Sequence, residues 1–441
     1  MSNSQLPAEV WRHVASQLVP GKDISTIAAM SSVSRSFNTI CQAFLYHTIT
    51  ARQLKHDSFA ASLQSKQHGA LRQACVREIT VEGTMHQEAL APSTRNAEDL
   101  IRLLRQRAEE QWNSAAVCLA ICSGIRTFQF SVHCDRTSRN SQIFIPHRTS
   151  LLQLPLVKTI KHLVLTSSTG IVTDMSSFGH LLLACPLLQE LSLHLIDPTS
   201  LLQPLIRQSD QDPSFTLKLS KINWNELCPG DYSELEDTWT FEPNICLWAR
   251  LSATRHYSFR GDIFNFEEPQ LQSFRWSQIL ELEMEQRHPY LWHIRPDWLS
   301  SLGRLFPSLR YLQLTNSWYE MRKLDLTDLV FYPNLTHLVV LTQQWLPSYV
   351  ESFKSQFLTL AKRLLNQHFA PNLQDMVIRL DNRYMGAAHE LGIEQGLKEL
   401  GNEDLKDTAH SLQRIRLECG PLFVEFRRAA DRWIKTSGSM A

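Results

Sequence analysis

A short apolar pattern recurs along the chain and constrains the fold more than any other feature. Each copy has an apolar residue, two others, a second apolar residue, one other and a third apolar residue, as in Leu309-x-x-Leu312-x-Leu314. The alternation at its end is typical of a β-strand that buries every second side chain. Copies begin at Val76, Ile125, Ile160, Leu188, Leu271, Leu309, Leu335, Leu373 and Leu412.

Several copies share a proline-containing lead, and helical stripes lie between the copies. The leads are Cys185-Pro186-Leu187-Leu188, Phe306-Pro307-Ser308-Leu309, Tyr332-Pro333-Asn334-Leu335 and Ala370-Pro371-Asn372-Leu373. The stripes are Leu100, Leu103 and Leu104; Leu181, Leu182 and Leu183; Trp298, Leu302 and Leu305; and Phe353, Phe357, Leu360, Leu364 and Leu365. Successive first positions from Leu309 onward lie 26, 38 and 39 residues apart. A strand followed by a helix at such steps indicates a solenoid of irregular repeats.

The region 71–441 therefore resembles a leucine-rich-repeat region of degenerate type. The resemblance implies an α/β fold class, with a solenoid of parallel strands and helices. The alternative is a single doubly wound α/β domain with an N-terminal helical extension. The repeated P-x-L-x-x-L-x-L lead favours the solenoid, because a doubly wound domain has no reason to repeat it.

The first fifty residues predict three short helices. Val10, Trp11, Val14 and Leu18 form one apolar stripe, with Pro7 in the first turn and Pro20-Gly21 after the last. Ile24, Ile27 and Ala28 form a second stripe, and Val33, Phe37, Ile40 and Phe44 a third. Periodicity alone also fits the opening helices of a larger α-rich domain.

The order of particular residues here resembles the F-box, especially its fungal form. The matching features are Leu6-Pro7 with Glu9-Val10, Asp23-Ile24, Val33-Ser34-Arg35 and Leu45-Tyr46. The resemblance implies a three-helix docking module at 1–50, followed by a linker at 51–70. It also implies that Leu6, Pro7, Val10, Val33 and Phe37 pack on a Skp-family adaptor, which in turn binds a cullin.

Together the two regions resemble an F-box/leucine-rich-repeat substrate receptor. That resemblance implies the substrate-recognition subunit of an SCF (Skp-cullin-F-box) ubiquitin ligase, whose repeat region binds a target protein. The alternative is a repeat scaffold that binds the adaptor in a complex without ubiquitin transfer.

The target-facing side chains can be predicted from strand alternation. Residues between the buried positions point to the opposite face, so Tyr311, Gln313, Arg379, Arg414 and Arg416 are candidate substrate-binding residues. The arginine fork suits carboxylate or phosphate, which predicts an acidic or phosphorylated target. Alternatively, these arginines pair with neighbouring carboxylates such as Glu418 and Asp375.

Composition narrows the partners. Lys+Arg and Asp+Glu are both 44, and this lack of basic excess argues against nucleic acid. No stretch reaches the roughly 18 apolar residues of a membrane helix, and the N-terminus lacks a secretory pattern. Nine scattered cysteines predict a reducing compartment, cytoplasm or nucleus, rather than a disulfide framework.

We expect neither an enzyme nor a cofactor. No phosphate loop, nucleophile elbow or zinc-protease motif is present in the sequence. Cys118, Cys122, His133 and Cys134 match no common zinc spacing, so buried thiols and a surface histidine are the better interpretation.

Two segments depart from the repeat. The segment 223–243 has six acidic residues and four aromatic ones without Lys or Arg, which suggests a solvated insertion or an acidic surface for a basic partner. The tail 423–434 has the spacing of an amphipathic helix that would cap the last repeat.

Overall fold

The computed structural model shows a mixed α/β protein rich in parallel strands, divided into two compact units. One unit comprises 1–219 with 228–237, and the other 220–227 with 238–441. The structure describes residues 13, 24–33, 35–50, 57–66, 69–85, 97–132, 142–143, 145–167, 174–194, 198–225, 254–260, 278–285, 303, 306–315, 332–342, 370–380, 411–419, 422–429 and 432–439.

The first unit begins with helices and continues as alternating strands and helices. Its parallel strands are β1 (Thr48–Ile49), β2 (Glu78–Glu82), β4 (Thr127–Val132), β6 (His162–Ser167) and β7 (Glu190–His194), adjacent in that order. A separate antiparallel pair joins β3 (Thr84–Met85) to β5 (Gln142–Ile143). The helical segments are α2 (Ile24–Val33), α3 (Arg35–Leu45), α5 (Asp57–Leu63), α6 (Gly69–Cys75), α7 (Ala97–Ile121), α8 (Arg148–Leu152), η2 (Pro155–Lys158), α9 (Ser176–Ala184) and α10 (Pro198–Gln211).

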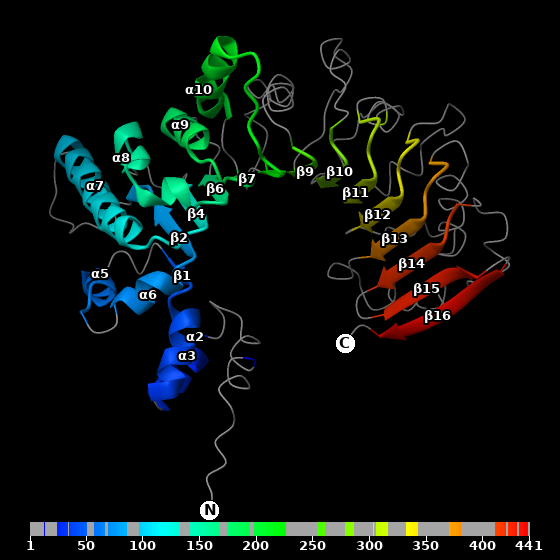
Figure 1. Cartoon of the computed structure of the whole chain (residues 1–441), viewed down its shortest axis with the longest axis horizontal. Helices are drawn as coiled ribbons and strands as arrows, with labels where there is room; N and C mark the ends of the chain where they lie inside the picture. The colour runs from blue at the N-terminus through cyan, green and yellow to red at the C-terminus, as the bar shows by residue number, and fades with distance from the viewer. Residues whose placement is uncertain are drawn as a thin grey trace, which may run out of the picture. The chain divides into compact units, whose positions relative to one another are not determined.

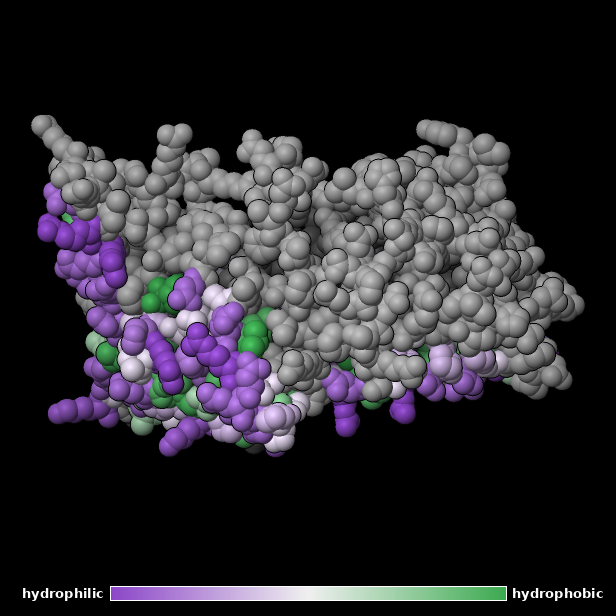
Figure 2. All heavy atoms as spheres, turned by 90° about the horizontal axis from the view of Figure 1, so that it is seen from above, coloured by the Kyte–Doolittle hydropathy of each residue, from purple (hydrophilic) through white to green (hydrophobic). Residues whose placement is uncertain are grey.

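Helices α7 to α10 line one face of the first unit's strands (Figure 1). On that face the ring of Phe178 in α9 lies 4.8 Å from the ring of Phe130 in β4. Seen from above, the helical side is mostly hydrophilic, with single hydrophobic residues scattered across it (Figure 2). Isolated exposed apolar residues are ordinary on a protein surface, so the described residues in this view do not make up an apolar docking patch.

The second unit is a run of strands in sequence order. They are β8 (Lys221–Asn225), β9 (His256–Arg260), β10 (Glu281–Glu285), β11 (Tyr311–Thr315), β12 (His337–Thr342), β13 (Asp375–Leu380), β14 (Arg414–Cys419), β15 (Leu422–Ala429) and β16 (Arg432–Ser439). Strands β8 to β14 are parallel, whereas β15 and β16 continue the sheet as an antiparallel hairpin.

The recurring pattern forms the core of this run, as its spacing predicts. Neighbouring copies align position by position, so that Leu312 lies beside Leu338 and Leu314 beside Val340. The pattern residues Leu309, Leu312, Leu314, Leu335, Leu338 and Val340 are all buried. The strands that carry them are adjacent and parallel. Burial of a whole leucine side chain contributes about 1.5–3 kcal/mol, so the stacked rows stabilise each strand on its neighbour.

The proline lead links one repeat to the next. The Asn334 side chain donates to the Pro307 carbonyl at 2.9 Å, and Asn372 donates to the Pro333 carbonyl at 2.7 Å. At the starts of β9 to β14 one backbone carbonyl also accepts from two amides, as when the carbonyl of Arg310 accepts from the amides of both Thr336 and His337. Proline followed by asparagine is therefore a structural signal for stacking in this chain.

The sequence analysis did not predict three strands of the second unit. Strands β8, β9 and β10 follow the same spacing, as in Ile279-x-x-Leu282-x-Met284, but without a proline lead and with fewer leucines. Residues 223–225 of the predicted acidic insertion belong to β8, where Trp224 is buried. The rest of that insertion, and the predicted strand at 271–276, lie outside the described residues.

The predicted C-terminal helix is wrong. Residues 423–429 and 432–434 lie in strands β15 and β16, which pair from Leu422 with Ser439 to Ala429 with Arg432. Phe426 and Trp433 are spaced acceptably for either a helix or two strands. Pairing with the exposed edge of β14 favours the strands, because it satisfies backbone groups that a helix would leave open.

The N-terminal prediction is met in part. Helices α2 and α3 form where the second and third stripes predict them, but Val33 ends α2 instead of opening the third helix. The predicted first helix lies outside the described residues apart from His13. The stretch 51–70, interpreted as a linker, contains α5 and the start of α6.

Helices are also present at the predicted helical stripes that fall within the described residues. Helix α7 contains the stripe that begins at Leu100, and α9 contains Leu181, Leu182 and Leu183. The stripes at 298–305 and 353–365 lie outside the described residues, except for Gly303.

Candidate functional site

The pair of helices α2 and α3 presents the first candidate surface. The two helices pack on each other, with Ile27 and Cys41 fully buried. Val33 is 71% exposed, more than any other large hydrophobic residue in the described part of the chain. Phe37 is half-buried, and Leu6, Pro7 and Val10 lie outside the described residues.

A polar clamp fixes this helix pair to the following helices. The buried Gln42 accepts a hydrogen bond from Nε of Arg72 in α6 at 3.1 Å. The Arg72 guanidinium also lies over the ring of Tyr46, at 5.1 Å from its centroid, and Tyr46 stacks on Phe59 of α5. These contacts hold α3, α5 and α6 together.

The helix pair leads directly into the parallel strands. Only two residues separate α3 from β1, and the His47 carbonyl between them accepts the backbone amides of Arg77 and Glu78. Thr48 of β1 donates to the Glu78 carboxylate of β2 at 3.0 Å. The first unit thus contains both the helix pair and the start of the repeats.

The second candidate surface is the polar face of strands β9 to β16. Side chains that alternate with the buried positions form rows across the strands, because the strands pair in register. Tyr311 and Gln313 lie on this face, and the Tyr311 hydroxyl donates to the Gln313 side-chain oxygen at 2.9 Å.

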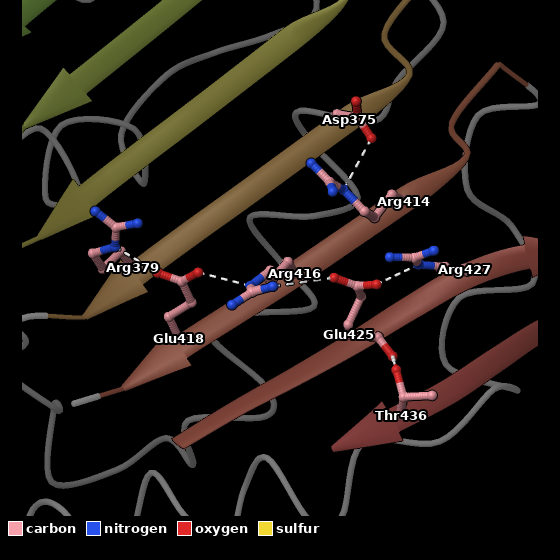
Figure 3. A network of polar contacts seen from close by, with 8 residues as sticks. All are labelled: Asp375, Arg379, Arg414, Arg416, Glu418, Glu425, Arg427 and Thr436. Atoms are coloured by element: carbon pink, nitrogen blue, oxygen red, sulfur yellow. Dashed lines mark hydrogen bonds and ion pairs between the residues drawn. The ribbon is translucent and has the colours of Figure 1, made fainter. Parts of the chain in front are cut away.

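A ladder of alternating charges crosses β13, β14 and β15 (Figure 3). Glu418 accepts Nε–H bonds from Arg379 at 2.5 Å and from Arg416 at 2.7 Å. Arg416 also lies 3.5 Å from Glu425, which in turn accepts from Nε of Arg427. Glu418 and Glu425 are almost completely buried, whereas Arg379 and Arg427 are 55% and 67% exposed.

A second row runs beside the ladder. Asp375 lies 2.9 Å from the His337 ring nitrogen and 3.1 Å from Nε of Arg414. Arg416 is held further by the ring of Phe423, with its guanidinium carbon 4.6 Å from the ring centroid. Carboxylates therefore accept hydrogen bonds from Nε of Arg379, Arg416 and Arg427, whereas Nε of Arg414 only lies within ion-pair distance of Asp375.

The candidate substrate-binding residues fall into two groups. Arg379, Arg414 and Arg416 come together on one face, and their pairing with Glu418 and Asp375 agrees with the alternative interpretation. Tyr311 and Gln313 lie on β11, two strands from Arg379 and three from Arg414 and Arg416. The sequence analysis missed Arg427 and Glu425 as members, because the tail was interpreted as a helix.

A group of one histidine and two glutamates lies on β9 and β10 of the same face. His256 contacts Glu281 at 2.6 Å and Glu283 at 3.3 Å. Burial acts to lower the pKa of His256, but the hydrogen bonds to Glu283 and Glu281 outweigh it and raise the pKa above 6.5. The same contact with His256 lowers the pKa of Glu283. Burial and the two glutamates raise the pKa of Tyr311 on the adjacent strand.

The cysteines of α7 lie in apolar surroundings. Cys118 and Cys122 are buried, and burial raises the pKa of these thiols to about 11 and about 12. Such thiols are poor nucleophiles because little thiolate forms. His133 and Cys134 lie outside the described residues. Among the residues that the structure describes, no three His, Cys, Asp or Glu side chains are placed to hold a metal ion.

Two further observations concern membrane helices and similarity to known proteins. No helix in its described part has the length and apolar character needed to cross a membrane. The chain matches no protein-family model and no curated protein sequence.

Proposed function

We propose that this protein is the substrate-recognition subunit of an SCF ubiquitin ligase, with an N-terminal F-box and a leucine-rich-repeat-like region. In this proposal the α2–α3 pair and the residues before it bind a Skp-family adaptor. The polar face of the repeat strands binds the target protein.

The exposure of Val33 is the observation that supports this proposal most directly. A valine that leaves 71% of its surface in water at the end of α2 contributes little to the chain's own core. The F-box resemblance assigns this position to the adaptor contact. Binding of this kind buries a few apolar anchors in a partner's groove.

The proposed mechanism is proximity rather than chemistry. The receptor performs no bond-making step and holds the target near a conjugating enzyme carried by the cullin. Target lysines then meet the activated ubiquitin at a high effective concentration. The clamp of Arg72 on Gln42 and Tyr46 keeps the docking helices fixed to the rest of the first unit.

The test is co-purification of adaptor and cullin with tagged full-length chain. Val33→Asp places a charge in the proposed contact and should reduce adaptor recovery by about thirtyfold or more, as at a binding hot spot. Combined Leu6→Ala and Pro7→Ala should have the same effect. Val117→Asp is a matched control, because Val117 is also a helical valine and is 41% exposed.

The result also separates the proposal from its alternative. Recovery of adaptor and cullin together supports the ligase subunit, whereas adaptor without cullin supports a scaffold that does not transfer ubiquitin. Equal adaptor recovery from Val33→Asp and Val117→Asp, with circular dichroism unchanged in both, would remove the F-box assignment.

A further inference from the structure

Two arginines face each other directly across β14 and β15. Arg414 and Arg427 are register partners in this antiparallel pair and lie on the same polar face. Side chains in such positions have Cβ atoms about 4.5–5.5 Å apart, and like charges placed there repel each other. The arrangement is favourable when a negative group lies between the two guanidinium groups.

One carboxylate lies against Nε of each of these arginines. Asp375 approaches Arg414 from β13, and Glu425 contacts Nε of Arg427 from its own strand. The Asp375 contact at 3.1 Å lacks hydrogen-bond alignment, so Nε of Arg414 is a buried donor without a hydrogen bond among the described residues. Both contacts involve Nε, and each guanidinium has two further nitrogens that can donate.

The other two arginines of the face form hydrogen bonds within the ladder. Arg379 and Arg416 share the buried carboxylate of Glu418, and Arg416 also contacts Glu425 and Phe423. Arg416 therefore stabilises the ladder, although the sequence suggested it as a ligand residue. Arg414 and Arg427 are accessible to a partner, because their side chains are 35% and 67% exposed.

We propose that Arg414 and Arg427 form a two-armed site for a phosphoryl group on a segment of a partner protein. The proposal rests on the proposed function, since it names the chemical class of target that this face binds. Each arginine contributes a fork from one strand, and the phosphoryl oxygens lie between the two forks.

The charge around the pair favours phosphate over carboxylate. Asp375, Glu418 and Glu425 lie on this face, but the four arginines Arg379, Arg414, Arg416 and Arg427 outnumber them, so the more highly charged anion is attracted more strongly. A phosphoryl group carries about −1.5 to −2 charges at neutral pH and three acceptor oxygens, against a single charge and two oxygens for a carboxylate. Its three oxygens can accept from both guanidinium groups at once, with one oxygen left for a further donor.

The experiment uses the full-length chain and an immobilised peptide pool with a central phosphoserine flanked by four randomised positions on each side. Matched pools carry serine or glutamate at the centre. The wild-type chain should prefer the phosphoserine pool, and Arg414→Gln or Arg427→Gln should each reduce that binding by about tenfold. Arg427→Lys keeps the charge but loses the fork, so it should bind at an intermediate level. Arg310→Gln, an exposed arginine before β11, is the control with the same charge change.

Several outcomes would overturn the inference. Equal retention on the serine and phosphoserine pools would do so, and so would full phosphoserine binding by both glutamine variants. Preference for the glutamate pool would show a carboxylate site instead. Adaptor recovery is measured on the same variants. A variant that loses phosphoserine binding but keeps adaptor binding has a defect in this site alone. Failure of adaptor binding in the wild-type chain concerns the proposed function.

Discussion

At the scale of single residues, the Glu418 carboxylate accepts hydrogen bonds from two arginines, although its side chain is only 5% exposed. Glu418→Gln keeps the shape but removes the charge, and it replaces one of the two acceptor oxygens that Arg379 and Arg416 use with an NH2 donor. Breaking a fully buried pair costs about 3–5 kcal/mol, and the partly exposed arginines here reduce the expected loss to about 1–3 kcal/mol.

Urea denaturation checks this expectation for Glu418. The control is Glu109→Gln, which removes an exposed pair with Arg105 on α7 and should cost about 0.5 kcal/mol or less. Similar midpoints for both variants would mean that the ladder does not stabilise the second unit.

His256 gives the strand face a predictable pH dependence. Its pKa is raised in the folded protein, so its contribution to stability is complete below 6.5 and is lost as pH rises through the folded value. The lowered pKa of Glu283 acts in the other direction, giving stability that is lost as pH falls through that lower pKa.

His256→Gln removes the titrating ring and keeps a polar side chain. The difference in urea midpoint between wild type and variant should therefore be largest near pH 6 and shrink by pH 9. A difference that stays constant across this range would show that the contacts with Glu281 and Glu283 do not depend on the charge of His256.

At the scale of elements, the C-terminal hairpin closes the core of the second unit. Trp433 of β16 is 4% exposed, whereas the next residue, Ile434, is 45% exposed on the opposite face. Trp433→Ala should lower the free energy of unfolding by about 3 kcal/mol, and Ile434→Ala by less than about 1 kcal/mol. Thermal denaturation measures both. Comparable losses would indicate that β16 does not bury Trp433 in solution.

The elements also show which parts of the fold are readable from the sequence. Copies rich in leucine, such as the one at Leu335, predict buried parallel strands because alternation and proline lead agree. The search for apolar triplets does not find strand β9, because polar Thr254 occupies the first apolar position of its copy and Tyr257 the second. The tail misleads because a short apolar run fits helix and strand alike, and the open edge of β14 decides between them.

The candidate surfaces are readable to a different extent. Alternation correctly places Arg379, Arg414 and Arg416 on one face, since the period of a strand is fixed. It does not reveal that Arg427 joins them, because that depends on the register of β15 against β14. Which carboxylate each arginine contacts also depends on distances between strands, which periodicity does not contain.

At the scale of the whole molecule, the proposed adaptor contact and the proposed phosphoryl site lie in different compact units. Val33 belongs to the first unit, and Arg414 and Arg427 belong to the second. Mutations at sites without shared partners are usually independent, so the two binding activities should be separable in one chain.

We therefore expect opposite losses from the two classes of variant when tagged chains are recovered from cells. Val33→Asp should lose the adaptor and keep its targets, which then accumulate on the receptor because no ubiquitin is transferred to them. The combined Arg414→Gln and Arg427→Gln variant should keep the adaptor and lose phosphorylated targets. Quantitative mass spectrometry of the captured proteins, with and without phosphatase treatment of the lysate, measures both losses. Targets that disappear equally from both variants would contradict the separation of roles, since adaptor binding would then be needed for target capture.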